Sequence, residues 1–228
     1  MRHHRSSSSP VGSLDQPTPA ATVVVPLLGQ PDAWLERGVR SVLEQTVEVQ
    51  AIVVRSAKTP ESNRIVLDDL QREVENLTVV EEERQSFPGA INQGIRLARA
   101  PRVGLLLADD WLDATTVEKC LRFDADIVCT GIAGYQSDGV TRAPRAEHVI
   151  TEREFRRQKT LEAKARYLCH FFLFRRTKLF EVGLLDETIG DYPGIDDYHL
   201  IWGLLEADAS VRIVEERLCM KRDHDGRD

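Results

Sequence analysis

The sequence lacks the cysteine and hydrophobic patterns of several protein classes. Its cysteines are widely scattered, without zinc-finger spacing or a disulfide framework, so we expect a reducing compartment, the cytoplasm; they are Cys120, Cys129, Cys169 and Cys219. No apolar run approaches the ~20 residues of a membrane-spanning helix, so we expect no transmembrane segment. Residues 1–20 contain arginines and a serine run in place of the apolar part of a secretory signal, and we expect a disordered tail there.

An excess of positive charge is also missing. The chain has 30 Lys and Arg residues against 37 Asp and Glu residues, a formal net charge of −7, which argues against broad nonspecific binding to nucleic acid. Hydrophobic residues make up 42% of the chain and charged residues 29%, a composition that supports a buried core with a polar surface. We therefore expect one domain over residues 21–228.

Strand and helix patterns alternate through the first half of the chain. Apolar, β-branched runs indicate strands, and segments with apolar residues on one face indicate helices. The expected strands are Thr22–Leu28, Val49–Val54, Leu77–Val80 and Val103–Ala108, and the expected helices are Ala33–Gln45, one ending near Val74, and Ala90–Ala100. Asp32 is placed to cap the first helix. This alternation predicts βαβ units around a mainly parallel sheet, an α/β fold.

The pattern changes after Trp111. Asp138-Gly139 predicts a hairpin turn, because such turns need positive φ angles. Thr151 and Glu154 form the capping box of one charged helix over Thr151–Lys164. The other expected elements are helices at Ala114–Phe123, Lys178–Val182 and Asp196–Glu206 and strands at Asp126–Ile132, Leu168–Phe174 and Val211–Val214.

The segment Val103–Trp111 carries the strongest chemical signal. A buried strand ends there in two carboxylates, Asp109 and Asp110, and ligands of α/β sheets bind at the carboxyl ends of such strands. Adjacent carboxylates repel each other unless a cation lies nearby, and hard oxygen ligands suit Mg²⁺ or Mn²⁺. The alternative is structural: Asp110 or Asp113 caps the helix that follows.

The order of the segments resembles that of the family-2-type glycosyltransferases with the GT-A fold, over about residues 22–224. Ser41–Thr46 matches a Ser-Val-Leu-x-Gln-Thr element, Gly89–Ile95 is similar to an Ala-Arg-Asn-x-Gly helix start, and Leu107–Asp110 stands where the family has Asp-x-Asp. The later matching segments are Arg175–Glu187, Asp196–Leu200 and Arg222–His224. The resemblance implies a mixed central sheet with helices on both faces.

The resemblance also implies an activity and a set of site residues. The expected reaction is inverting transfer of a sugar from a nucleoside-diphosphate sugar to an acceptor hydroxyl, with Mn²⁺ or Mg²⁺ as cofactor. Asp109 and His224 would bind the metal, and Asp197 would take the acceptor proton. The expected donor contacts are Pro26, Arg55, Asn92, Asp110 and Trp111, and the expected acceptor contacts are Asp196, Tyr198 and Trp202.

Three positions on the nucleotide side depart from the family pattern. Arg55–Lys58 replaces Asp-Asp-Gly-Ser, Leu107 replaces the first Asp of Asp-x-Asp, and Ile91 replaces the Arg of Ala-Arg-Asn. Two explanations stay open. Either the donor has an unusual nucleotide or binding mode, in which the cations Arg55 and Lys58 contact a phosphate or another base edge, or the domain is inactive and serves as a binding or scaffolding subunit.

The acceptor class is left open by the sequence. A glycan, a lipid-linked glycan and a small molecule are all compatible, and a cluster of cations over residues 153–166 suggests modified DNA as a further alternative. A metal-dependent nucleotidyltransferase is a third reading of the first half. It is disfavoured because residues 27–31, Leu-Leu-Gly-Gln-Pro, form a poor phosphate-binding loop.

Overall fold

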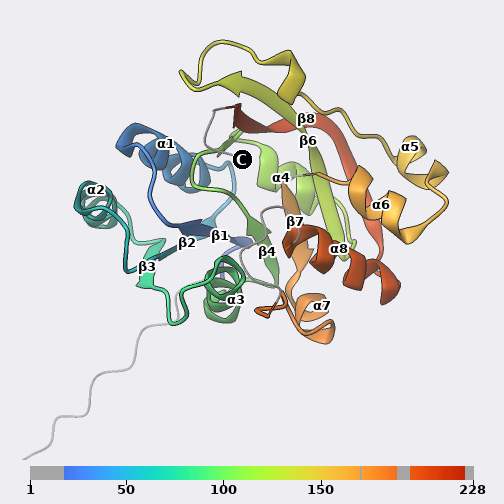
Figure 1. Ribbon diagram of the computed structural model, residues 1–228, viewed down its shortest axis with the longest axis horizontal. Helices are drawn as coiled ribbons and strands as arrows, with labels where there is room; N and C mark the ends of the chain where they lie inside the picture. Colours follow the sequence, from blue (N-terminus) through green and yellow to red (C-terminus); the bar gives the residue numbers. More distant parts are fainter. Residues whose placement is uncertain (1–17, 170, 189–195, 224–228) are drawn as a thin grey trace, which may run out of the picture.

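The structure is a computed structural model that describes residues 18–169, 171–188 and 196–223 (Figure 1). Most of the expected N-terminal tail, residues 1–17, lies outside this range. The strands are β1 (Ala21–Leu27), β2 (Val49–Arg55), β3 (Leu77–Glu81), β4 (Arg102–Leu105), β5 (Trp111–Leu112), β6 (Ile127–Gln136), β7 (Phe172–Arg175) and β8 (Val211–Asp223). The helices are α1 (Asp32–Leu43), α2 (Glu61–Glu73), α3 (Phe87–Leu97), α4 (Thr116–Leu121), η1 (Pro144–Ala146), α5 (Glu152–Arg157), α6 (Leu161–Tyr167), α7 (Arg176–Glu181) and α8 (Asp196–Glu206).

The strands form one mixed sheet in the order β3-β2-β1-β4-β7-β6-β8-β5. The first four strands of this order are parallel to one another, as βαβ units require. Strand β7 then runs antiparallel to both β4 and β6, and β8 runs parallel to β6. The parallel half is the part that the alternating sequence pattern predicts.

Helices cover both faces of the sheet, so the expected α/β fold with a mixed central sheet is confirmed (Figure 1). Side chains alternate along β1: Val23 and Val25 pack toward α1, α2 and α4, while Val24 packs toward α3, α7 and α8. Both sets are fully buried. Strands buried on both faces explain why they appear in the sequence as continuous apolar runs.

Helix α3 approaches the sheet closely. A Cβ atom added to Gly94 would lie 2.3 Å from Cγ1 of Val24, so a side chain at this position would collide with β1. The absence of a side chain at Gly94 therefore allows α3 to pack closely against β1. Along the chain, α3 is followed by β4 and then by the turn that carries Asp109 and Asp110.

Several predicted elements differ from the observed ones. The single helix expected over Thr151–Lys164 is two helices, α5 and α6, and each has its own threonine cap: Thr151 accepts from the N–H of Glu154, and Thr160 accepts from the N–H of Ala163. Asp32 does not cap α1, because the helix begins at Asp32 itself. Strand β8 is far longer than the expected Val211–Val214, and β5 was not predicted.

The predicted hairpin turn is present. Gly139 has φ +67°, and its N–H donates to the carbonyl of Gln136 over 2.8 Å. Asp138 accepts hydrogen bonds from the N–H groups of Val140 and Thr141, which fixes the turn. In the part of the chain that the structure describes, no helix is both long and apolar enough for a membrane span.

Candidate functional site

The order of the strands indicates where in the sheet a ligand binds. From β1 the chain moves through α1 to β2 on one side, whereas from β3 it crosses through α3 to β4 on the other side of β1. Ligands of such sheets bind where the strand order reverses, outside the carboxyl ends of the two strands, here β1 and β4. Pro26, at this end of β1, is buried, and the Asp109–Asp110 pair follows β4.

A tight turn carries the two carboxylates. Leu106 still pairs with β1, through its N–H and the carbonyl of Val24 (3.0 Å), and the N–H of Asp110 then donates to the carbonyl of Leu107 (3.1 Å). We call Leu107–Asp110 the acidic turn. Asp109 and Asp110 are only 5% and 4% exposed, so both carboxylates are buried in the protein. Asp110 does not cap α4, whose N-cap is Thr115, and neither does Asp113, which instead accepts a hydrogen bond from the N–H of Thr115.

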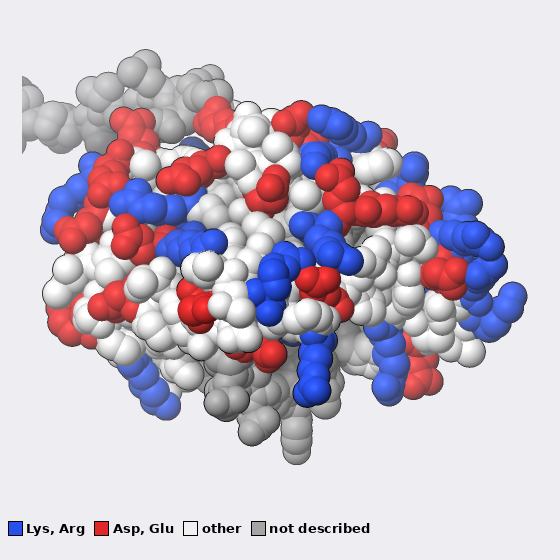
Figure 2. Space-filling model, turned by 90° about the horizontal axis from the view of Figure 1, so that it is seen from above, with Lys and Arg blue, Asp and Glu red and all other residues white. Residues whose placement is uncertain are grey.

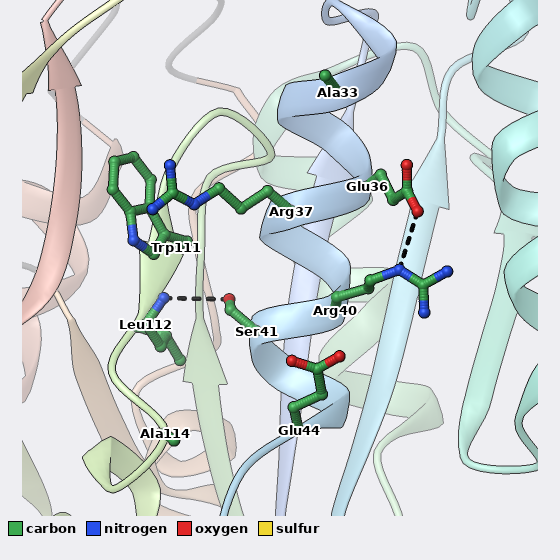
Figure 3. Close-up of a pocket in the computed structure, with 9 residues that line it drawn as sticks. All are labelled: Ala33, Glu36, Arg37, Arg40, Ser41, Glu44, Trp111, Leu112 and Ala114. Carbon is green, nitrogen blue, oxygen red and sulfur yellow. Dashed lines mark hydrogen bonds and ion pairs between the residues drawn. The ribbon is translucent and has the colours of Figure 1, made fainter. Parts of the chain in front are cut away.

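Trp111 lies directly after the acidic turn, in β5. The residue is 6% exposed, and the guanidinium of Arg37 stacks on its ring, with Cζ 3.7 Å from the ring centroid. Figure 3 shows Arg37 reaching from α1 to the indole. Both residues line a cavity of about 430 Å³. The N–H of Leu112 donates to Oγ of Ser41 on the same helix (3.1 Å). Helix α1 therefore fixes the exit of the acidic turn.

Arg222, near the end of β8, is buried against the acidic turn. Its main-chain N–H donates to Oδ1 of Asp110 over 2.8 Å, and its Nε donates to the carbonyl of Asp109 over 3.1 Å. Burial lowers the pKa of Arg222, as does Arg37, while the nearby carboxylates raise it. A guanidinium stays protonated throughout, so the turn has a permanent cation beside it.

The donor set of the acidic turn fits a divalent cation. Two buried carboxylates supply hard oxygen ligands, and Mg²⁺ sites commonly use one or two carboxylates together with substrate phosphates and water. Among the described side chains, no group of three or more His, Cys, Asp or Glu residues gathers as a complete metal cage. The predicted ligand His224 lies outside the described residues.

The nucleotide side holds a network of charged residues at the ends of β2 and β3. Arg55 pairs with Glu81, its neighbour in the sheet, with 3.7 Å between Nη2 and Oε2. Arg64 reaches the same carboxylate over 3.7 Å and also donates to the carbonyls of Thr59 and Ala57. A carboxylate is therefore present beside the position where the family pattern has Asp-Asp-Gly-Ser, but it comes from β3.

Asn92 is committed to the protein's own chain. Its amide nitrogen donates to the carbonyl of Leu185 and to Oε1 of Glu187, both over 2.9 Å, and its Oδ1 accepts from the N–H of Leu185. This hydrogen bond from Asn92 is the main cause of the lowered pKa of Glu187, to which Arg84 and Arg96 also donate. Asn92 thus holds the Leu185–Glu187 segment on α3, and both its N–H groups are used there.

A groove of about 670 Å³ lies between α6 and α8. Asp197, in the first turn of α8, lines it together with Tyr198, Arg166 and Phe172. Tyr198 contacts the ring of Trp202 edge to face at 5.9 Å, and Arg166 lies 5.6 Å above Tyr198. The groove thus has aromatic walls, a carboxylate and a cation. The side chain of Asp196 lies outside the described residues.

The acidic turn with Asp109 and the groove with Asp197 lie toward the same end of the central strands. Phe172, which lines the groove, is the first residue of β7 and pairs with Leu105, the last residue of β4. From Leu105 the chain enters the acidic turn within two residues. The groove with Asp197 and the acidic turn with Asp109 therefore open from neighbouring strand ends.

Three of the six cations over residues 153–166 form ion pairs with glutamates. Arg156, Arg157 and Arg166 pair with Glu152, Glu154 and Glu162 of the same helices. Figure 2 shows acidic side chains interspersed with the basic ones over the visible face. A surface of mixed charge gives little support to a polyanionic acceptor such as DNA.

Arg222 and Glu187 were not among the predicted site residues. Arg222 stands in a charged segment that follows the expected last strand, and nothing in its local pattern distinguishes a buried arginine from an exposed one. The segments Gly89–Ile95 and Arg175–Glu187 do match the family pattern, but the contact between Asn92 and Glu187 joins residues 95 positions apart.

Curated relatives and solved structures support one assignment. The chain is 26% identical over 182 residues to the uncharacterised glycosyltransferase EpsJ of Bacillus subtilis (strain 168), covering 75% of this chain and 52% of that protein. It is 21% identical over 128 residues to the putative glycosyltransferase EpsH of the same organism, covering 54% and 37%. The chain thus spans about half the length, or less, of these relatives.

The fold is shared with S. aureus TarS 1–349 in complex with UDP-GlcNAc, at TM-score 0.69 and 15% identity over 90% of this chain and 59% of that one. It is also shared with the mannosyltransferase PcManGT of Pyrobaculum calidifontis in complex with GDP-Man and Mn²⁺, at TM-score 0.68 and 19% identity over 92% and 59%. Residues 22–184 match the family model described as glycosyl transferase family 2. With most of its length matched by that model, the chain belongs to glycosyl transferase family 2 and has the GT-A fold.

Proposed function

We propose that the protein transfers a sugar from a nucleoside-diphosphate sugar to an acceptor hydroxyl, with inversion at the anomeric carbon and with Mn²⁺ or Mg²⁺ bound. One observation carries the proposal: the buried carboxylates of the acidic turn and the groove lined by Asp197 open from the paired ends of β4 and β7. Donor and acceptor would meet between them.

The donor would lie over the carboxyl ends of β1, β2 and β4. In our proposal Asp109 binds the divalent cation, with His224 assisting, while Asp110 and Trp111 shape the pocket. When bound, the cation neutralises negative charge that develops on the leaving diphosphate. Pro26 and Arg55 would border the nucleotide. Asn92, whose two N–H groups are used within the chain, would act indirectly by fixing the Leu185–Glu187 segment.

The acceptor would occupy the groove between α6 and α8. Asp197 takes the proton of the acceptor hydroxyl, whose oxygen attacks the anomeric carbon from the side opposite the diphosphate. The bond between that carbon and the diphosphate oxygen breaks, and the diphosphate leaves with the electron pair. Tyr198 and Trp202 offer aromatic surface of the kind that packs against sugar rings. Asp196 would be a further acceptor contact.

Substitution of Asp197 tests this reaction. Asp197→Asn is expected to lower release of nucleoside diphosphate at least a hundredfold, the size of a general-base contribution, and to leave donor affinity within about twofold. Turnover would be measured by mass spectrometry with a panel of nucleotide sugars and mixed glycan acceptors, and affinity by calorimetry. The matched control is Asp208→Asn, an exposed carboxylate just beyond α8, which should behave as wild type.

Three outcomes separate the candidate functions. Retained transfer by Asp197→Asn would remove Asp197 from the mechanism. Donor binding by the wild-type protein without turnover on any acceptor would favour the alternative of an inactive, binding-only domain. Turnover with a modified DNA acceptor alone would change the acceptor class that we propose.

A further inference from the structure

Arg222 is an unusual side chain for its environment. It is 2% exposed and is the largest of the fully buried side chains, although arginine is almost never fully buried without partners. Its Nη1 donates to the carbonyl of Ser137 over 2.8 Å, in addition to the bonds to Asp109 and Asp110. One residue of β8 therefore ties the acidic turn to the hairpin that follows β6.

Aromatic rings complete the surroundings of the guanidinium. Its Cζ lies 4.5 Å from the ring centroid of Trp34 and 4.9 Å from that of Trp111. Arg37 stacks on Trp111 as well and donates to the carbonyl of Gly139 over 2.8 Å. A planar guanidinium suits these contacts, whereas a lysine ammonium retains the charge but not the stacking or the fork of donors.

The charges around Arg222 come from three elements of the site. Carboxylates approach from the acidic turn, Asp109 and Asp110, and from the hairpin, Asp138, and all three stabilise the charged guanidinium. Arg37 approaches from α1 and opposes it. These named groups carry three negative and two positive charges, so without Arg222 the acidic turn would be much more negative.

We propose that Arg222 is a positioning residue that serves as the built-in counter-charge of the acidic turn, so that a divalent cation is taken up together with the donor diphosphate rather than alone. A metal approaching by itself meets carboxylates whose charge Arg222 already balances. A metal complexed to a diphosphate brings extra phosphate oxygens and less positive charge. This inference rests on the metal-binding role of Asp109 in the proposed function.

Titration with Mn²⁺ alone tests the counter-charge directly. Arg222→Met removes the charge and should lower the dissociation constant for Mn²⁺ by on the order of tenfold, because one repulsive charge near a divalent ion is lost. Arg222→Lys keeps the charge and should bind Mn²⁺ as wild type does. The measurement is electron paramagnetic resonance of free Mn²⁺, with no nucleotide present. The matched control is Arg217→Met, a partly exposed β8 arginine paired with Glu147.

A second variant keeps the test possible if Arg222→Met does not fold. Arg37 is the other cation near the acidic turn, and it is exposed. Arg37→Met should tighten Mn²⁺ binding by a smaller factor, about twofold to threefold. Unchanged or weaker Mn²⁺ binding in folded Arg222→Met and Arg37→Met would overturn the proposal, as would the absence of any Mn²⁺ binding in all variants. If Mn²⁺ binding tightens but no nucleotide sugar is turned over, the inference stands and the proposed function fails.

Discussion

The structural role of a single residue in this protein often cannot be inferred from its chemical type. Asn92 and Arg222 are both polar and both lie near the candidate site, yet each bonds mainly to distant parts of its own chain. Asn92 lies in a segment of α3 that matches a family motif, and its role is to anchor the chain that leads toward α8. A motif match thus locates such a residue without stating what it contacts.

The pH dependence of stability is also decided by individual residues. Burial raises the pKa of Asp126, but hydrogen bonds from Ser210 and Arg175 outweigh burial and hold the pKa down at about 2. Because the pKa is lower in the folded state than in the unfolded chain, the contribution to stability is fully present above about pH 4. It is lost as the pH falls through about 2.

We therefore expect wild type to lose about 2 kcal/mol of unfolding free energy between pH 4 and pH 2 through Asp126, a loss that Asp126→Asn lacks. Urea unfolding across this range measures it. The comparison variant is Asp124→Asn, which changes an exposed carboxylate paired with Arg175. It should still lose most of this unfolding free energy between pH 4 and pH 2. Equal acid slopes for wild type and Asp126→Asn would show that the side chain does not carry the effect.

At the scale of helices and strands, local patterns predicted most of the first half. Amphipathic segments and buried apolar runs located β1 to β4 and α1 to α3 to within a few residues, because both core clusters impose a regular period on them. The second half was harder. Two threonine caps split one charged segment into α5 and α6, and β8 continues through charged residues because β6 and β5 supply its partners.

The site was predictable only in part for the same reason. Asp109 and Asp110 end a long apolar run, so local sequence exposes them. Arg222 reaches them only because β8 pairs with β5, a two-residue strand with no recognisable pattern of its own. Contacts between segments more than a hundred residues apart, as between Arg222 and Asp110, follow from strand order and not from spacing along the chain.

Two glycines in helices test how closely the helices pack. Gly94→Ala should lower the melting temperature by several degrees, because its Cβ would lie 2.3 Å from Val24 and overpacking costs about 1–3 kcal/mol. Gly203→Ala in α8 is the matched substitution. No atom of the described residues lies within 4 Å of its Cβ, so the higher helix propensity of alanine should raise stability slightly. Calorimetry of both variants is the measurement, and a stabilised Gly94→Ala would refute the close packing of α3 on β1.

The whole molecule combines two halves with different tasks. In our proposal the carboxyl ends of β1, β2 and β4, in the parallel half, bind the nucleotide. The antiparallel strands with α6 and α8 form the groove that Asp197 lines. The chain spans about half the length, or less, of its curated relatives. The family model matches residues 22–184, which in our proposal include most of the residues that bind the donor.

Metal-dependent donor binding is the most direct test of this account. The melting temperature would be measured for wild type and Asp109→Asn with UDP-, GDP- and dTDP-sugars, each with Mn²⁺ and with chelator. We predict that one nucleotide sugar at a hundred times its dissociation constant raises the melting temperature of wild type by roughly 5–10 °C with Mn²⁺. Neither chelator-treated protein nor Asp109→Asn should show this rise. No rise with any donor, or an equal rise in chelator and in Asp109→Asn, would contradict a metal-assisted donor site at the acidic turn.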